Sequence, residues 1–189
     1  MILRLKVKIL FVILGLIFLF MKTFSAICLL LFTIVSCTNK TADVKEKPQI
    51  TELSTNYTSV FNEFTKENDT LYVVNFWATW CKPCVEELPD FMKINNEFKT
   101  DKFKIILVSL DKGSDFETKV KDYIKTNNIT PDVYVLSDNK RMNEWIPKIN
   151  KTWSGAIPAT AIYKNGKQVF FTEGQISYND LVNTINKFK

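Results

Sequence analysis

Continuous apolar runs of strand length alternate with stretches of helical periodicity in the part of the chain after residue 70. The runs Leu71–Trp77, Phe103–Leu110 and Asp132–Leu136 have the length and the β-branched and aromatic content of buried strands. Between them, residues 85–98 and 116–127 carry apolar side chains about one helical turn apart. This alternation predicts parallel strands joined by right-handed crossovers, and therefore an α/β fold.

The C-terminal part of the chain adds a hairpin to this pattern. Two strand-like segments, 159–163 and 168–172, flank the dipeptide Asn165-Gly166. Asn-Gly between two such segments is the strongest short-range indicator of a tight hairpin turn. Two antiparallel strands therefore join the parallel ones, which predicts a central mixed sheet flanked by helices.

Two further helices are predicted at the ends of the pattern. Residues 57–67 have apolar side chains at helical spacing and end at the turn-forming pair Asn68-Asp69. Near the C-terminus, Ser177 and Asp180 form a capping box in front of a final amphipathic helix.

The N-terminal region has a different pattern. Its apolar runs, Ile9–Phe20 and Phe24–Val35, are each short for a membrane-spanning helix and are separated by Lys22. The second run has a charged start, an apolar middle and a small residue before Cys37, which is the layout of an export signal. Residues 1–37 are therefore predicted to be a targeting and anchoring segment.

Two interpretations of this segment remain open. The tetrapeptide 34–37, IVSC, resembles the lipobox of bacterial lipoproteins, which implies lipidation of Cys37 as the new N-terminus, with Met21 as an alternative start. Alternatively, both apolar runs form one uncleaved transmembrane anchor with Lys22 near its middle, at a cost of roughly 3 kcal/mol for the buried charge. Either way, the expected location is the cell envelope, membrane-anchored, with the domain facing the periplasm or the exterior.

The rest of the chain divides into a tether and one domain. Residues 38–50 are polar and charged and have no apolar periodicity, which is typical of a flexible tether. Residues 51–189 are enough for one hydrophobic core of ordinary size and too few for a second domain.

The charge and the composition exclude some functions. Four of the 25 basic residues precede Cys37, where no acidic residue offsets them, so the remaining 21 basic and 20 acidic residues nearly cancel. Nucleic-acid binding therefore has no electrostatic support. Since the chain contains no histidine, the commonest nitrogen ligand for zinc or copper is missing, and we expect neither a metal site nor a cofactor.

Cys81 and Cys84 stand three residues apart where the first long helix begins. This spacing allows a reversible disulfide, and the helix N-terminus stabilises thiolate over thiol, lowering cysteine pKa values to about 3.5 to 7.5. Thiolate is the attacking species, so Cys81 is the candidate nucleophile and Cys84 the resolving thiol. Lys82 adds a positive charge nearby. The two alternatives are a structural disulfide, which would close too small a loop to stabilise the fold much, and half of a zinc site, for which further ligands are missing.

The segment 73–89, VVNFWATWCKPCVEELP, resembles the active-site segment of thioredoxin-like proteins, in particular the TlpA and ResA group of membrane-tethered bacterial thiol-disulfide oxidoreductases. The resemblance runs from about residue 71 to the C-terminus. It implies a thioredoxin-like fold, with Cys81 as an exposed nucleophile and Cys84 as a buried resolving cysteine. Residues 112–131 would correspond to the strand and helix that the TlpA and ResA group inserts into this fold.

The same resemblance implies substrate-binding positions around the dithiol. Trp80 and Pro83 would shape the active-site turn. Pro158 would be the family's cis-proline facing the dithiol, and Ile157 before it would offer backbone hydrogen bonds to a substrate strand. The alternative for Pro158 is an ordinary trans proline before an edge strand.

Two positions bear on proton transfer. Thioredoxins carry a buried aspartate under the dithiol, whereas the matching residue here is Asn75, which cannot take a proton. Glu87 matches a glutamate that lies near the dithiol in the ResA group. A partly buried carboxyl there would have a raised pKa and could carry the proton of the resolving thiol. The alternative for Glu87 is a solvated helix residue, as we assume for Glu86.

Several functions are compatible with these residues. The leading hypothesis is reduction of disulfides in exported, cysteine-containing envelope proteins, such as apocytochrome c, with electrons from a membrane donor. A disulfide oxidant or isomerase would use the same residues at a different reduction potential. A peroxiredoxin, a copper chaperone and a non-catalytic binding module of the same fold are the remaining alternatives.

Overall fold

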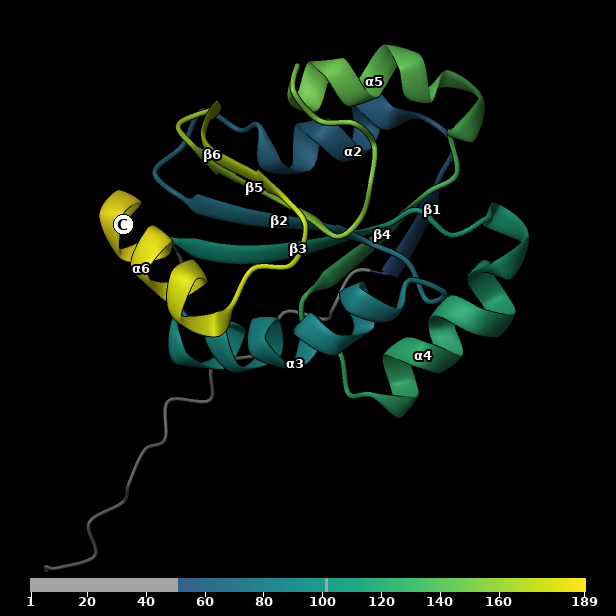
Figure 1. Cartoon of the computed structure of the whole chain (residues 1–189), viewed down its shortest axis with the longest axis horizontal. Coiled ribbons are helices and arrows are strands. Elements are labelled where there is room, and N and C mark those ends of the chain that lie inside the picture. Colours follow the sequence, from purple (N-terminus) through teal and green to yellow (C-terminus); the bar gives the residue numbers. More distant parts are fainter. Residues whose placement is uncertain (1–50, 101) are drawn as a thin grey trace, which may run out of the picture. The chain divides into compact units, whose positions relative to one another are not determined.

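Each apolar run predicted to be a strand lies in one six-stranded sheet (Figure 1). The computed structural model describes residues 51–100 and 102–189. Along the sheet the strand order is β1-β4-β3-β2-β5-β6. The strands are β1 (Thr51–Ser54), β2 (Leu71–Trp77), β3 (Phe103–Ser109), β4 (Asp132–Leu136), β5 (Ala159–Lys164) and β6 (Lys167–Glu173). The predicted anchor, the lipidation of Cys37 and the tether lie outside the described residues.

The sheet is mixed, as the sequence pattern predicted. β2, β3, β4 and β1 run parallel to one another, whereas β5 pairs antiparallel with both β2 and β6. The turn between β5 and β6 contains Asn165 and Gly166, both with positive φ, which is the backbone that a tight hairpin requires. β2 is buried along its whole length, because helices cover both faces of the sheet.

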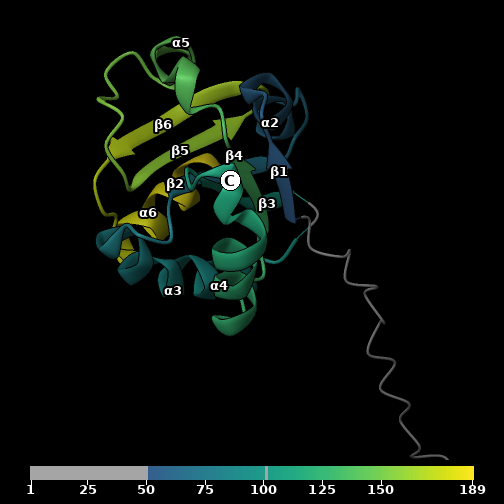
Figure 2. The same ribbon diagram turned by 90° about the vertical axis from the view of Figure 1, so that its right-hand side faces the viewer.

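The helices form two layers on opposite faces of the sheet (Figures 1 and 2). One layer contains α2 and α5, and the other contains α3, α4 and α6. The helices are α2 (Tyr57–Phe64), α3 (Lys82–Glu97), α4 (Lys121–Thr126), α5 (Met142–Ile149) and α6 (Tyr178–Phe188). Alternate residues of β2 point into the two layers: Val73 and Trp77 pack with α3, whereas Val74 and Phe76 pack with α2 and α5.

The segment between β3 and β4 is less regular than predicted. Instead of one helix over 116–127, a 3-10 turn (Gly113–Asp115) and a π-helical turn (Phe116–Val120) lead into α4. β4 then lies between β3 and β1 in the sheet. Residues 112–131, which the resemblance matched to an inserted strand and helix, thus contain these two turns and α4 but no strand.

Two elements were not predicted from the sequence. β1 has four residues and only one large apolar side chain, Leu53, so it lacks an alternating pattern. α5 has eight residues and contains Pro147, which favours a loop when only the sequence is considered. Among the described residues, no helix combines the length and the apolar character needed to cross a membrane.

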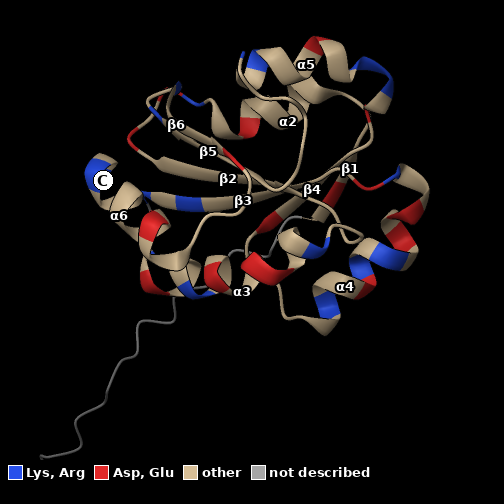
Figure 3. Ribbon diagram, in the orientation of Figure 1, with Lys and Arg blue, Asp and Glu red and all other residues tan. Residues whose placement is uncertain are grey.

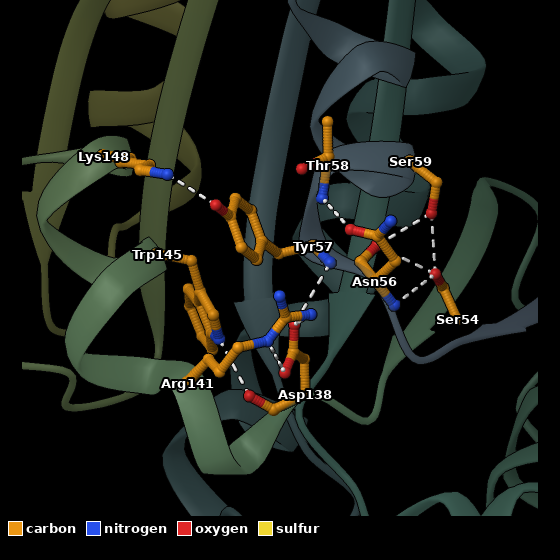
Figure 4. Close-up of polar contacts among 9 residues, drawn as sticks. All are labelled: Ser54, Asn56, Tyr57, Thr58, Ser59, Asp138, Arg141, Trp145 and Lys148. Atoms are coloured by element: carbon orange, nitrogen blue, oxygen red, sulfur yellow. Dashed lines mark hydrogen bonds and ion pairs between the residues drawn. The ribbon is translucent and has the colours of Figure 1, made fainter.

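Polar contacts around Asp138 connect α2 with α5, the two helices on the face of the sheet opposite α3 (Figure 4). The Asp138 carboxylate accepts two hydrogen bonds from Arg141, at 2.9 and 2.6 Å, and one from the Tyr57 backbone N–H at 3.4 Å. Its carbonyl oxygen accepts from the Trp145 indole at 3.0 Å, and Lys148 donates to the Tyr57 hydroxyl. These contacts attach the start of α2 to α5.

Charged residues of both signs lie along α3 and α4, with more acidic than basic residues on α3 (Figure 3). Several are paired at helical spacing, such as Lys121 with Glu117 at 2.8 Å. Exposed pairs of this kind contribute little to stability. The mixture of signs agrees with the nearly equal numbers of basic and acidic residues after Cys37.

Candidate active site

The dithiol lies where β2 ends and α3 begins. Cys81 is the N-cap of α3, and its sulfur accepts a hydrogen bond from the Cys84 backbone N–H at 3.4 Å. The two cysteines form a disulfide with a Cα–Cα distance of 5.3 Å. Cys81 is 5% exposed and Cys84 is fully buried. Cys81 is therefore the more accessible sulfur, although it is far less exposed than the family resemblance implied, because the surrounding loops cover it.

The charge near Cys81 comes mainly from the helix itself. The Cys84 N–H in the first turn of α3 points toward the sulfur, and N–H groups at a helix N-terminus stabilise a thiolate. The ammonium of Lys82 lies 3.8 Å from Glu86, and both side chains are more than half exposed. Its positive charge is thus partly offset and well solvated, so Lys82 contributes less than the sequence suggested.

The loop before β5 faces the dithiol. The peptide bond between Ile157 and Pro158 is cis. The carbonyl oxygen of Ile157 lies 3.7 Å from the sulfur of Cys81. Since a disulfide sulfur carries no proton, this is a contact and not a hydrogen bond. The structure thus brings the pair Cys81 and Cys84 next to the pair Ile157 and Pro158, although 73 positions of the sequence separate Cys84 from Ile157.

Several residues that sequence reasoning missed hold this loop in place. The Glu173 carboxylate accepts hydrogen bonds from the Ser154 backbone N–H and hydroxyl, both at 2.7 Å. These bonds lower the pKa of Glu173 below its usual range. The Trp153 indole donates to the Ala156 carbonyl at 2.8 Å, and the Gly174 N–H donates to the Pro158 carbonyl at 2.8 Å. No local pattern reveals contacts between segments so far apart in the chain.

The turn before Cys81 is attached to the end of β3. Asp111 is fully buried, and its carboxyl group accepts from the Thr79 N–H at 2.9 Å and from the Thr79 hydroxyl at 2.7 Å. It also accepts from the Ser109 hydroxyl at 2.7 Å. Trp80, between Thr79 and Cys81, is 67% exposed. A polar residue directly after a buried strand was the available sequence indication for Asp111.

Glu87 lies in the core, one turn of α3 after Cys84. It is only 4% exposed, and its carboxyl oxygens accept from the Asn75 amide at 2.8 Å and from the Ile176 N–H at 3.0 Å. Burial raises the pKa of Glu87 to about 7, against the lowering effect of these two hydrogen bonds and with a smaller raising effect from Asp90. Glu87 is therefore not a solvated helix residue, unlike the exposed Glu86.

The loop between β6 and α6 completes the surroundings of the dithiol. The Gln175 side chain donates to the Pro83 carbonyl at 2.9 Å, and the neighbouring Ile176 N–H binds Glu87. This loop thus contacts both the first turn of α3 and the buried carboxyl group. Within the described parts of the chain, no group of three or more potential metal ligands is placed to hold a metal ion.

A comparison with protein-family models matches residues 44–169, more than half of the chain, to the model described as the AhpC/TSA family. The chain belongs to the AhpC/TSA family. Curated relatives agree with this. The sporulation thiol-disulfide oxidoreductase A of Bacillus subtilis (strain 168) is 32% identical over 73 residues, which are 39% of this chain and 44% of the relative.

A second relative of this AhpC/TSA family member is the thiol-disulfide oxidoreductase ResA of Oceanobacillus iheyensis, 46% identical over 115 residues. That match covers 60% of this chain and 55% of ResA. The chain therefore spans about half the length of these two curated relatives. The resemblance to the ResA group that the segment 73–89 indicated is confirmed.

The crystal structure of StoA from Bacillus subtilis has the same fold as this AhpC/TSA family member. Its TM-score is 0.51 at 24% identity, and the match covers 61% of this chain and 82% of the StoA chain. The thioredoxin-like fold expected from the sequence is confirmed. Residues assigned from the sequence converge around the disulfide or adjoin it: Trp80, Cys81, Pro83, Cys84, Glu87, Ile157 and Pro158.

Proposed function

We propose that this protein is a thiol-disulfide oxidoreductase that exchanges disulfides with cysteine-containing proteins through Cys81 and Cys84. The observation that carries the proposal is a disulfide at the N-terminus of α3 that faces the cis-proline loop at Ile157. The names of the relatives, thiol-disulfide oxidoreductases, support the same chemistry.

In the reducing direction, the Cys81 thiolate attacks one sulfur of the client disulfide. A mixed disulfide forms, and the first client sulfur leaves as a thiolate. The Cys84 thiol then gives its proton to Glu87 and attacks the Cys81 sulfur, which releases the second client thiolate. Two electrons have moved from the dithiol to the client, and an external dithiol donor must reduce the Cys81–Cys84 bond before the next cycle.

Trp80 and the Ile157 backbone provide the contact surface for the client in this proposal. The exposed indole of Trp80 offers apolar area beside the disulfide. An extended client segment passing the cis-proline loop would find free backbone hydrogen-bonding groups at Ile157. Pro83 fixes the first turn of α3, where a proline is well tolerated because its position has no N–H partner within the helix.

The test is insulin disulfide reduction by the full chain in detergent, with a small dithiol as the electron source. Cys81→Ser should abolish the reaction. Cys84→Ser should instead accumulate a mixed disulfide between Cys81 and the client, because the resolving thiol is missing. If the wild-type chain does not reduce insulin and Cys84→Ser forms no adduct, the protein is a binding module and the proposal is wrong.

The direction of electron flow depends on the reduction potential of the Cys81–Cys84 pair. We propose that the protein reduces disulfides of exported proteins, with apocytochrome c as one candidate client. Equilibration with a thiol buffer should then give a potential near roughly −270 mV, the reducing end of the thioredoxin range. A potential nearer about −120 mV would identify a disulfide oxidant and would contradict the proposed role in cytochrome c maturation.

We further propose that the chain is anchored to the membrane through residues 1–37, with residues 51–189 as the folded domain outside the cytoplasm and a membrane protein as its electron donor. The support is the export-signal pattern before Cys37. Mass spectrometry of the purified membrane form decides between the two anchors. Fatty-acid mass on an N-terminal Cys37 indicates a lipoprotein, and an intact N-terminus indicates an uncleaved helix.

A further inference from the structure

Asn75 is buried between Glu87 and β5. It lies in the middle of β2, is fully inaccessible, and points into the layer that holds α3. Its amide nitrogen donates to Glu87 at 2.8 Å and to the Thr160 hydroxyl at 3.1 Å. Both N–H bonds are used in this way, whereas the amide oxygen has no hydrogen-bond partner. A buried acceptor without a partner is costly and calls for a reason.

The reason lies in the two protonation states of Glu87. An ionised carboxylate only accepts hydrogen bonds, so the amide must present its N–H to Glu87. A protonated carboxyl group donates, so the same position must then hold an acceptor. Rotating the Asn75 amide by half a turn puts its oxygen where its nitrogen was. The oxygen can then accept from both Glu87 and Thr160, because a threonine hydroxyl can donate as well as accept.

We infer that Asn75 is a positioning residue whose amide reverses when Glu87 gains or loses its proton, so that Glu87 keeps a hydrogen-bond partner in both states. In each orientation one end of the amide lacks a partner, and the proton on Glu87 decides which orientation makes the better hydrogen bonds. The inference rests on the proposed function, in which Glu87 takes the proton of Cys84.

The other contacts of Glu87 allow the Asn75 amide to reverse without any other residue moving. The Ile176 N–H donates to the second carboxyl oxygen of Glu87, Oε2, whereas Asn75 contacts Oε1. A proton on Oε1 therefore leaves the contact with the β6–α6 loop intact. Asp90 on α3 is the charged side chain that raises the pKa of Glu87. The hydrogen-bond partners of Glu87, which are Asn75 on β2 and the Ile176 N–H in the β6–α6 loop, are uncharged. An aspartate at position 75 would instead compete with Glu87 for the same proton.

The experiment follows the carboxyl carbon of Glu87 and the side-chain amide of Asn75 by NMR in the oxidised full chain in detergent micelles. Both signals should change with one shared midpoint as the pH is varied. In Glu87→Gln the amide signal of Asn75 should no longer change over this range. An amide signal that does not follow the Glu87 titration in the wild-type chain would show that the amide does not reverse.

Variants at position 75 test the effect on Glu87 itself. Asn75→Ala removes the donor to the carboxylate, so the Glu87 midpoint should rise by about one pH unit, and Asn75→Asp should raise it further because of like-charge repulsion. Asn75→Ser keeps one group that both donates and accepts, and should give a smaller rise than alanine. Val74→Ala, on the other face of β2, should leave the midpoint unchanged.

These titrations need no turnover and therefore separate the two proposals. An unchanged Glu87 midpoint in both Asn75→Ala and Asn75→Asp overturns the role of Asn75, whatever the activity is. The expected midpoints together with no insulin reduction would leave the role of Asn75 in place and would contradict the proposed function instead.

Discussion

At the scale of single residues, Glu87 is the most unusual group next to the dithiol. A buried carboxyl group is costly to ionise, yet this one accepts two hydrogen bonds that stabilise its charge. The balance leaves its pKa at about 7. A group with this proton affinity can both take up and release a proton near neutral pH, which is the property required for exchange between a thiol and a thiolate.

The raised pKa of Glu87 has a consequence for stability. Below about pH 4.5 the group is protonated in both the folded and the unfolded chain. Between about 4.5 and 7 the unfolded chain loses the proton and the folded chain keeps it, so the free energy of unfolding falls as the pH rises. The loss is complete above the folded pKa and amounts to on the order of 3 kcal/mol.

We therefore expect Glu87→Gln to flatten the pH dependence of stability between pH 4.5 and 7, as measured by urea unfolding of the oxidised protein at several pH values. The same substitution should slow disulfide reduction, because the proton acceptor for Cys84 is lost. Glu86→Gln, at the exposed neighbouring position, is the matched control and should change neither quantity. An unchanged reduction rate in Glu87→Gln would remove its role in proton transfer.

A second residue-scale prediction concerns Asp111. Its carboxyl group accepts three hydrogen bonds, two of them from Thr79. Asp111→Ala leaves these donors unpaired and should lower the free energy of unfolding by about 3 kcal/mol, as measured by urea unfolding. Asp115→Ala, a nearby residue in a surface ion pair, should cost less than about 1 kcal/mol. Equal losses in the two variants would contradict the anchoring role of Asp111.

At the scale of elements, the site depends on connections between segments more than on the helix that carries the cysteines. The end of β6 holds the loop before β5 through Glu173, and the loop after β6 holds α3 through Gln175 and Ile176. The turn before α3 is attached to the end of β3. Three connections thus meet at one disulfide, so we expect a change in any of them to affect binding of the proposed client without altering either sulfur.

Glu173→Ala should release Ser154 and loosen the cis-proline loop. We expect the KM for a protein disulfide to rise several-fold, whereas the reduction potential of the Cys81–Cys84 pair should stay the same, because the hydrogen bond from the Cys84 N–H to the Cys81 sulfur lies within α3 and does not depend on this loop. Glu117→Ala, which breaks an exposed ion pair in the segment between β3 and β4, serves as the control for KM. A shifted potential with an unchanged KM would show that the loop acts on the sulfurs and not on the client.

At the scale of the whole molecule, the sheet separates the layer that contains the reactive residues from a layer of packing residues. The layer with α3, α4 and α6 contains the disulfide, Asn75 and Glu87. The layer with α2 and α5 contains an aromatic cluster centred on Trp153. The Trp153 ring contacts the rings of Phe76, Trp145 and Phe171. Trp145 and Trp153 are packing residues, and Trp153 also supports the cis-proline loop.

Matched core substitutions can test this division. Leu88→Ala lies one turn of α3 after Cys84, and Ile106→Ala lies on the opposite face of the sheet. Each removes a fully buried aliphatic side chain and should cost about 2 to 5 kcal/mol in urea unfolding. Only Leu88→Ala should also alter the rate of disulfide exchange, since it loosens the helix that carries the dithiol. Equal effects on exchange would show that the two layers are not separate.

How much of this could be read from the sequence differs between elements. The periodicity predicted β2, β3, β4, the hairpin and the main helices, because each of these buries a regular face. β1 and α5 were not predicted. The four residues of β1 form a strand only because they pair with β4, and α5 forms despite Pro147 because its apolar side chains pack in the core. The π-helical turn at Phe116–Val120 has no distinct pattern of apolar residues.

The sequence by itself determined the reactive pair, its place at a helix N-terminus and the mixed sheet, because each depends on residue types at short spacing. Only the tertiary structure decided that Glu87 is buried, that Asn75 lies against it and that Glu173 fixes the opposing loop. Glu87 and Ile176 are 89 residues apart, and Asn75 and Thr160 are 85 apart. Contacts of that range depend on how the sheet orders its strands, and no local pattern along the chain encodes them.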